Sequence, residues 1–270
     1  MTTLPYRLCA IDLDDTLLDD DHQISERNSR AVRAVMERGV IVVVASGRMY
    51  ATTRPAVSRL GLTTPVICYN GAMVRLANDG ETWLDEIVPA DTAANIRSYA
   101  RANSLQLNYY LDDRVYTAAV TPWMELYQKR TSADFIVLGD DFEKKLAGTS
   151  PTKLVVVDAP EKIDVLLPVQ RDHYAGQLYV TKSNAEYLEF LPLDANKGSA
   201  LALVAERYGI PQAQTLAFGD SWNDVPMLQW AGMGIAVANA KPEVLAAANR
   251  VVGSNKEDGV GIALEEIFGF

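Results

Sequence analysis

The run Val40–Ala45 constrains the fold of this chain more than any other segment. It reads VIVVVA and is almost entirely β-branched, which is typical of a strand buried on both faces of a parallel sheet. Two shorter apolar runs, Tyr6–Ile11 and Val66–Tyr69, have the same character, and segments with helical spacing separate the three. Alternating strands and helices predict an α/β fold with a doubly wound, mostly parallel sheet whose ligands bind at the carboxyl ends of the strands.

The pattern changes after about residue 72. Two pairs of strand-like runs flank the turn signals Asn78-Asp79-Gly80 and Asp112-Asp113-Arg114, and further runs of both types follow. From Lys197 the alternation of helix and strand returns. We therefore predict a core made of residues 1–81 and 192–270, with residues 82–191 forming an inserted α+β domain.

Composition and charge narrow the classes of partner and location. The 270 residues are 49% hydrophobic with a net charge of −10, which favours neither nucleic acid nor an anionic membrane as partner. Cys9 and Cys68 lie in apolar runs and are expected to be buried and reduced. We find no signal-peptide pattern and no apolar run of membrane-spanning length. A cytoplasmic protein, monomeric or a small homo-oligomer, is expected.

Polar clusters follow three of the predicted strands, and a fourth polar feature opens a helix. The residues concerned are Asp12 and Asp14, Ser46 and Gly47, Asp220, Asn223 and Asp224, and the helix-opening Lys197. Parallel strands place their carboxyl ends at one edge of a sheet, so these side chains are expected to converge there.

The chemistry of these residue types suits phosphoryl transfer. Extended backbone would put Asp12 and Asp14 on one face, where two carboxylates repel each other unless a cation or a proton intervenes. With only two histidines in the chain, an all-oxygen Mg²⁺ site involving these residues and Asp220 is the better expectation. Phosphoryl transfer needs a nucleophile, a cation and donors to the phosphoryl oxygens.

Simpler interpretations exist for each feature alone. Asp12 and Asp14 could be a solvated exit from a strand, Ser46-Gly47-Arg48 a plain helix start, and the segment 219–224 a helix cap. A calcium-binding loop is excluded because Leu17 and Gln23 stand where a glycine and a bidentate glutamate are needed. The four features together favour phosphoryl transfer.

Several motifs resemble the haloacid dehalogenase superfamily, in particular its Cof-type phosphatases. They are Asp12-Leu13-Asp14-Asp15-Thr16-Leu17, Ser46-Gly47-Arg48, Tyr69-Asn70-Gly71-Ala72, Asn196-Lys197-Gly198-Ser199-Ala200-Leu201 and Gly219-Asp220-Ser221-Trp222-Asn223-Asp224. The resemblance implies a Rossmann-like core with a large cap inserted between the second and third motifs. Asp15 departs from the commonest pattern, which has glycine there.

The resemblance also implies roles for the acidic residues. Asp12 would attack phosphorus and become an aspartyl-phosphate, while Asp14 would act as general acid and then as general base. Mg²⁺ would be held by the carboxylates of Asp12 and Asp220 and by the main-chain carbonyl of Asp14. Asp224 would support the metal shell or orient Lys197.

A second group of residues would hold the phosphoryl oxygens. It comprises Ser46, Lys197, Asn223 and the backbone amides near Leu13 and Gly47.

The expected activity is Mg²⁺-dependent hydrolysis of a small phosphorylated metabolite, such as a sugar phosphate, a nucleotide or a cofactor precursor. The cap is expected to close over the site and choose the substrate, with Tyr109, Arg114, Tyr116 and Lys182 as candidate contacts. Three alternatives stay open: a phosphotransferase or phosphomutase with the same intermediate, a phospho-accepting signalling receiver, and a binding protein without turnover.

Overall fold

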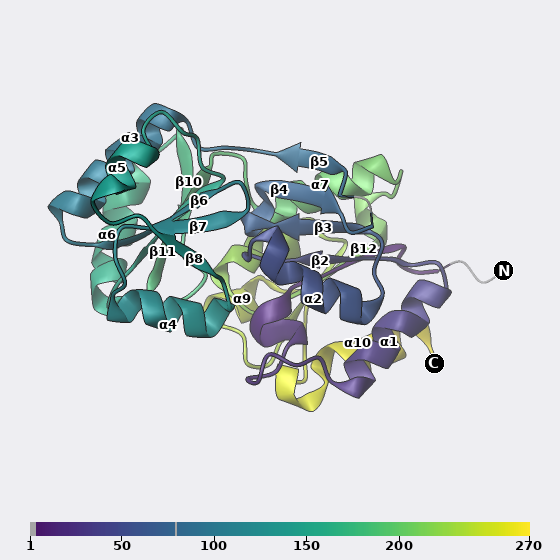
Figure 1. Ribbon diagram of the computed structural model, residues 1–270. Helices are drawn as coiled ribbons and strands as arrows, with labels where there is room; N and C mark the ends of the chain where they lie inside the picture. Colours follow the sequence, from purple (N-terminus) through teal and green to yellow (C-terminus); the bar gives the residue numbers. More distant parts are fainter. Residues whose placement is uncertain (1–3, 79) are drawn as a thin grey trace. The chain divides into compact units, whose positions relative to one another are not determined.

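The computed structural model describes residues 4–78 and 80–270, so Asp79 of the predicted turn lies outside the described residues. The chain divides into two compact units (Figure 1). The first unit comprises Met1–Gly47, Thr53–Trp83 and Asn196–Phe270, and the second comprises Arg48–Thr52 and Leu84–Ala195. The predicted domain boundaries stay a prediction, because compactness does not show which segments fold alone.

An eight-stranded sheet dominates the first unit within the described part of the chain, in the order β14-β13-β12-β1-β2-β3-β4-β5. Its strands are β1 (Leu8–Ile11), β2 (Ile41–Ala45), β3 (Pro65–Cys68), β4 (Met73–Leu76), β5 (Thr82–Asp85), β12 (Thr215–Gly219), β13 (Met233–Val237) and β14 (Arg250–Val252). The strands from β14 to β3 pair in parallel, and β4 pairs antiparallel with β3. The predicted doubly wound, mostly parallel sheet is confirmed.

The order of the strands creates a switch point at β1. The chain runs from β1 to β2 and β3 on one side and returns to β12 on the other. Ile11, the last residue of β1, is paired with Val44 and with Phe218. The segments that leave β1, β2 and β12 therefore emerge at the same edge of the sheet, where α/β folds bind ligands.

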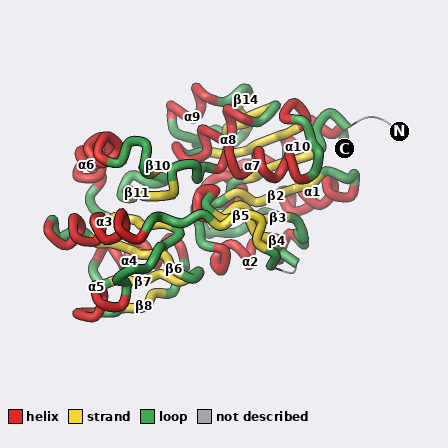
Figure 2. The backbone as a smooth tube through the Cα atoms, turned by 90° about the horizontal axis from the view of Figure 1, so that it is seen from above, coloured by secondary structure: helices red, strands yellow, loops and turns green. Residues whose placement is uncertain are grey.

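The helices of this part of the chain are α1 (Glu26–Glu37), α2 (Tyr50–Leu60), α7 (Lys197–Arg207), α8 (Val225–Trp230), α9 (Pro242–Ala247) and α10 (Gly259–Phe268). Helix α1 begins at the predicted cap Ser25, whose Oγ accepts a hydrogen bond from Asn28 N at 3.0 Å. Helices α1 and α10 pack together, as do α7 and α8. Figure 2 shows α2 and α7 on opposite sides of strands β2 to β4, so both faces of the sheet are covered.

The second unit is an α+β structure, as predicted. Its described strands are β6 (Gln106–Leu111), β7 (Arg114–Thr117), β8 (Phe135–Val137), β9 (Lys153–Val157), β10 (Leu178–Thr181) and β11 (Tyr187–Pro192), in the order β10-β11-β9-β6-β7-β8. Its helices are α3 (Ala90–Ala102), α4 (Pro122–Thr131), α5 (Phe142–Lys145) and α6 (Pro160–His173). Only the β7–β8 pair is parallel among the pairings given by the described residues.

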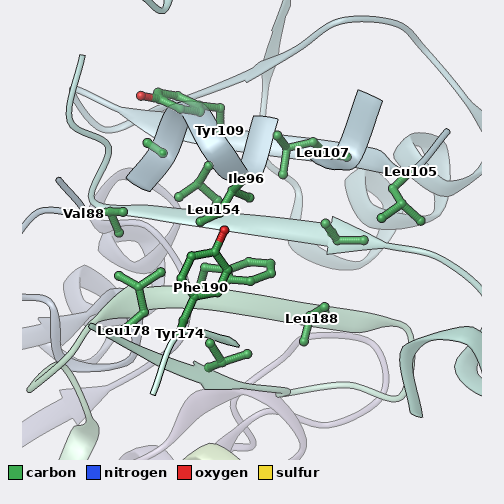
Figure 3. Packing of buried hydrophobic residues seen from close by; sticks show 14 of the residues in the cluster. Val88, Ile96, Leu105, Leu107, Tyr109, Leu154, Tyr174, Leu178, Leu188 and Phe190 are labelled. Atoms are coloured by element: carbon green, nitrogen blue, oxygen red, sulfur yellow. The ribbon is translucent and has the colours of Figure 1, made fainter. Parts of the chain in front are cut away.

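The two faces of the second sheet differ in polarity. Alternate residues of β6, β9 and β11, including Tyr109, Leu154 and Phe190, join one apolar cluster with residues of α3 and α6 (Figure 3). Residues between them face the other way, and two of these, Lys153 and Glu189, form an ion pair at 3.3 Å although each is only 2% exposed. The unit thus has an apolar helical side and a side with buried charge.

Two predictions from composition can be checked directly. Cys9 and Cys68 are buried and are not joined to each other in a disulfide, which confirms the expectation that they are buried and reduced. Among the described residues, no helix has the length and hydropathy needed to cross a membrane.

Candidate active site

Asp12 and Lys197 come from opposite ends of the sequence and meet in the interior. Asp12 directly follows β1, and its backbone N–H donates to Phe218 O at 3.0 Å, which fixes it beside the end of β12. Lys197 is the first residue of α7, and its side chain is completely buried. Its Nζ lies 2.6 Å from Asp12 Oδ1 and 2.6 Å from Asp224 Oδ1. The lysine therefore bridges two carboxylates.

The position of Lys197 is unfavourable for the helix alone. An ammonium at a helix N-terminus faces the positive end of the helix dipole, and complete burial adds a desolvation cost. The two charge-assisted hydrogen bonds to Asp12 and Asp224 offset both. The N-cap Asn196 keeps the first turn formed, because its side chain accepts a hydrogen bond from Ser199 N at 2.9 Å.

Asp220 and Asp224 are fixed by the turn that follows β12. The Oδ2 atom of Asp224 accepts hydrogen bonds from the backbone N–H groups of Asp220 and Ser221, each at 3.0 Å. Thr16 Oγ1 donates to Asp220 Oδ1 at 2.9 Å. A Cβ at Gly219 would lie 2.5 Å from the Cβ of Asp224, so only glycine leaves room for this packing.

Three carboxylates converge in this way. Asp12, Asp220 and Asp224 each offer an oxygen, and these oxygens lie within 4.8 Å of one another. Three carboxylates and the Lys197 ammonium leave a formal charge of −2 in a buried site, since −3 + 1 = −2. Hard oxygen ligands with this charge fit a divalent cation such as Mg²⁺, so the donor set is suited to the predicted metal.

Burial and the neighbouring charges shift the pKa values of Asp12, Asp220 and Lys197. Burial and the neighbouring Asp224 raise the pKa of Asp12 to about 8, although Lys197 acts in the opposite direction. Burial and the charge of Asp12 raise the pKa of Asp220 to about 9. Burial alone would lower the pKa of Lys197, but Asp12 and Asp224 raise it overall. The lysine is therefore charged, and a cation is needed to keep Asp12 and Asp220 ionised near neutral pH.

The Asp14 carboxylate lies outside this cluster. Leu13–Leu17 form a π-type helical turn in which Asp14 (φ −72°, ψ 126°) and Asp15 (φ 60°, ψ 5°) are not helical. Asp12 (φ −67°, ψ 156°) and Asp14 both have extended backbone angles, and the expectation that their side chains share one face stays a prediction. The Asp14 side chain is 40% exposed and its Oδ1 lies 3.9 Å from His22 Nδ1.

The same turn explains how aspartate can stand at position 15, where the commonest family pattern has glycine. Asp15 has a left-handed backbone, which glycine adopts at no steric cost and aspartate tolerates better than most residues. Asn239 Nδ2 donates to Asp15 O at 2.7 Å and ties the turn to the loop after β13. The buried Leu13 closes it, since its carbonyl accepts from Leu18 N at 2.8 Å.

Ser46 and Gly47 continue β2 into the same edge of the sheet. Ser46 is fully buried, and its N–H donates to Ile67 O at 2.8 Å. A Cβ at Gly47 would stand 2.7 Å from Asn70 Oδ1, so the close approach requires glycine. Asn223 Nδ2 donates to this same Asn70 Oδ1 at 2.8 Å. The loops after β2, β3 and β12 thus touch one another.

Sequence reasoning assigned no role to two residues of this region. Thr16 is buried and binds Asp220, and Asn70 is buried and binds Asn223. Both stand inside the quoted motifs, and Asn70 comes two residues after the end of β3. That position at a strand end was the available signal.

The four candidate contacts of the second unit differ in their surroundings. Tyr109 belongs to the apolar cluster, and its hydroxyl donates to Thr149 O at 2.9 Å. Tyr116 packs against the same cluster. Lys182 forms an ion pair with Asp164 at 2.5 Å, and Arg114 is exposed. The roles of these four residues toward a substrate stay predictions.

Comparisons with known proteins agree with the fold. The family model of haloacid dehalogenase-like hydrolases matches residues 9–264. The chain is 29% identical to the 5-amino-6-(5-phospho-D-ribitylamino)uracil phosphatase YitU of Bacillus subtilis, over 99% of both chains. It is 30% identical to the HMP-PP phosphatase of Serratia proteamaculans, over 88% of this chain and 86% of that one.

A solved structure is also similar to this chain over almost its whole length. TM0651 from Thermotoga maritima superposes with a TM-score of 0.83 at 32% identity, over 97% of both chains. The resemblance stated from the motifs is confirmed by the family match and by these relatives. The chain belongs to the haloacid dehalogenase-like hydrolases, of Cof type, and is an enzyme of the phosphatase class.

Proposed function

We propose that this protein hydrolyses small phosphate monoesters with Mg²⁺ as cofactor, through an aspartyl-phosphate on Asp12. The observation that supports this most is the buried cluster in which Lys197 bridges Asp12 and Asp224 while Asp220 lies beside them. A buried carboxylate held in place at the carboxyl edge of a sheet, with a cation site next to it, is what in-line attack on phosphorus requires.

The carboxylates of Asp12 and Asp220 and the carbonyl of Asp14 would hold the ion. Mg²⁺, when bound, would neutralise the acids and the phosphoryl oxygens. Asp224 would act through Lys197 and through the backbone of the 220–221 turn, which its two oxygens bind. Its two hydrogen-bonded oxygens make it a support for the site rather than a primary ligand.

In the first step, an oxygen of Asp12 attacks phosphorus and the bond from phosphorus to the alcohol oxygen breaks. Asp14 gives its proton to that oxygen, so the alcohol leaves neutral. The partly exposed Asp14 carboxylate lies outside the acid cluster, so its side chain is not one of the proposed metal ligands.

The phosphoryl oxygens need several donors during this step. Lys197 would supply charge, Ser46 a hydroxyl, and Asn223 an amide. The backbone amides of Leu13 and Gly47 would complete the set.

In the second step, Asp14 takes a proton from water, and the water oxygen attacks phosphorus. The bond between phosphorus and Asp12 breaks, which releases inorganic phosphate and restores the carboxylate. Atoms and charges balance over the two steps: ester and water enter, and alcohol and phosphate leave.

Small phosphorylated metabolites are the proposed substrates. The name of the Bacillus subtilis relative identifies a phosphorylated ribityl compound as its substrate, and we extend that substrate class to this chain: sugar phosphates, nucleotides or cofactor precursors. The net charge of −10 disfavours phosphorylated nucleic acid.

The first test is a panel of phosphorylated metabolites assayed with and without Mg²⁺. Asp12→Asn should lower kcat by several orders of magnitude, because an amide is a poor nucleophile toward phosphorus. Asp21→Asn, in an exposed loop, is the matched control and should leave kcat unchanged. Full activity in Asp12→Asn would refute the nucleophile assignment.

The same panel separates hydrolysis from transfer. If phosphate release stays constant when a second alcohol is added, water is the acceptor. If release falls and a new phosphate ester forms in its place, the phosphotransferase alternative is correct.

A further inference from the structure

The turn after β3 carries an arrangement that the proposed mechanism does not use. Tyr69, Asn70 and Gly71 have successive positive φ angles of 51°, 56° and 106°. Tyr69 and Asn70 are both completely buried. A left-handed backbone is unfavourable for a tyrosine, so packing around the turn must hold it. Strained, buried backbone of this kind clusters at functional sites.

Contacts of this turn reach three separate segments of the first unit. Asn70 N donates to Ser46 O at 3.1 Å. Its side-chain Oδ1 accepts from Asn223 Nδ2 at 2.8 Å. A Cβ at Gly71 would stand 2.3 Å from Asn196 O, so the turn also lies directly against the residue that precedes Lys197.

Asn70 is the side chain that joins these segments. Its Oδ1 receives the Asn223 amide and also limits the space at Gly47, where a Cβ would lie only 2.7 Å away. Asn223 is 6% exposed, and its Oδ1 has no hydrogen-bond partner among the described residues. The bond to Asn70 is therefore what orients the Asn223 amide.

We propose that Asn70 is a positioning residue for the phosphate site. It holds the Asn223 amide and the Ser46–Gly47 turn at fixed separation, so that both present their donors to the same phosphoryl group. The left-handed backbone at residue 70 is what turns the side chain toward these two segments. Asparagine suits the position because it tolerates that backbone and carries an amide oxygen.

This inference rests on the proposed function, and its test keeps the two apart. Asn70→Gly removes the amide but retains a residue that adopts positive φ freely, so the turn itself should survive. We expect KM and the Kd for inorganic phosphate, measured calorimetrically on the Mg²⁺-loaded protein, to rise by about 10-fold to 100-fold, as for other outer-layer supports of an active site. The melting temperature should fall as well, because the buried Asn223 amide loses its hydrogen-bond partner.

A double-mutant cycle with Asn223→Ala gives a second readout. If Asn70 acts through Asn223, the double variant should be no weaker toward phosphate than the weaker single variant. If the losses of phosphate affinity in the two single variants multiplied in the double variant, Asn70 would not act through Asn223. Asn28→Ala is the matched control: Asn28 is 1% exposed and its Oδ1 accepts from Gly261 N at 2.8 Å. It should lower the melting temperature and leave phosphate affinity unchanged.

Each outcome decides one claim. Unchanged phosphate affinity and KM in Asn70→Gly would overturn the inference while the proposed function stands. Weakened phosphate binding in that variant, with no ester hydrolysed by the unmodified protein, would support the inference and sink the proposed function. If the unmodified protein neither binds phosphate nor hydrolyses any ester, both fail.

Discussion

Lys197 is the residue on which the electrostatics of the site depend most. It is fully buried between Asp12 and Asp224. Removing one partner of a buried ionic group leaves uncompensated charge, which typically costs about 3 to 5 kcal/mol. Lys197→Met should therefore lower the free energy of unfolding by roughly that amount and abolish turnover. Lys197→Arg should not restore activity, because the planar guanidinium does not match an ammonium site.

Urea unfolding of the metal-free protein measures this effect. Lys162→Met is the control, since Lys162 forms an ion pair with Asp158 at 2.7 Å but is 44% exposed. A surface pair of this kind contributes about 0–1 kcal/mol. If Lys197→Met were as stable as Lys162→Met, the bridging role of Lys197 would be wrong.

The sequence was informative about some residues of the site and silent about others. Asp12 and Asp220 follow apolar strands and Lys197 opens a helix, so the rule for parallel sheets was enough to bring them together. The role of Asn70 depends on a left-handed turn and on clearances at Gly47 and Gly71 that no periodicity encodes. The π-type helical turn over Leu13–Leu17 was likewise not encoded by any periodicity.

At the level of elements, helix α7 connects stability to chemistry. Its N-cap Asn196 and the N3 residue Ser199 form a reciprocal capping box on either side of the buried Lys197. Asn196→Ala should cost about 1 kcal/mol of stability, as typical N-cap losses do. Because the first turn also aims Lys197, kcat should fall as well.

Asn196→Asp is the conservative variant, since a carboxylate also caps a helix. Thermal unfolding and steady-state kinetics on the two variants check the prediction. An alanine variant indistinguishable from the unmodified protein in both measurements would show that the cap does not support Lys197.

Elements of the two units differed in how well the sequence predicted them. β2 was predictable because its run is apolar throughout, whereas α4 was not predicted. Among the residues of α4, only Met124 and Tyr127 are buried, so no apolar stripe marks it. β5 shows a different limit. Hydrogen bonding places it at the edge of the eight-stranded sheet, and local patterns do not reveal which sheet a strand joins.

At the scale of the whole molecule, the acid cluster predicts how stability depends on pH. In the unfolded chain aspartates ionise near pH ~4, whereas the folded pKa values of Asp12 and Asp220 are raised to about 8 and about 9. At pH values between the unfolded pKa and these folded pKa values, the folded protein binds more protons than the unfolded chain. The metal-free protein should therefore lose stability as the pH rises through this window.

Mg²⁺ should reverse this trend, because it favours the ionised carboxylates. The gain in melting temperature on replacing EDTA by Mg²⁺ should be larger at pH 8 than at pH 5. Asp220→Asn should weaken two pH dependences, because it removes one titrating ligand. These are the dependence of the metal-free stability on pH and the dependence of the Mg²⁺-induced gain on pH. If Mg²⁺ raised the melting temperature by the same amount at all pH values, the assignment of these acids as ligands would be contradicted.

The most direct test of the central claim is to trap the phosphoenzyme. Turnover of a good substrate is quenched with acid within milliseconds, the acyl phosphate is reduced with borohydride, and the modified residue is located by mass spectrometry. We predict conversion of Asp12 to homoserine, dependent on Mg²⁺ and absent without substrate. Modification at another carboxylate, or rapid hydrolysis with no modification at Asp12, would contradict a covalent route through this residue.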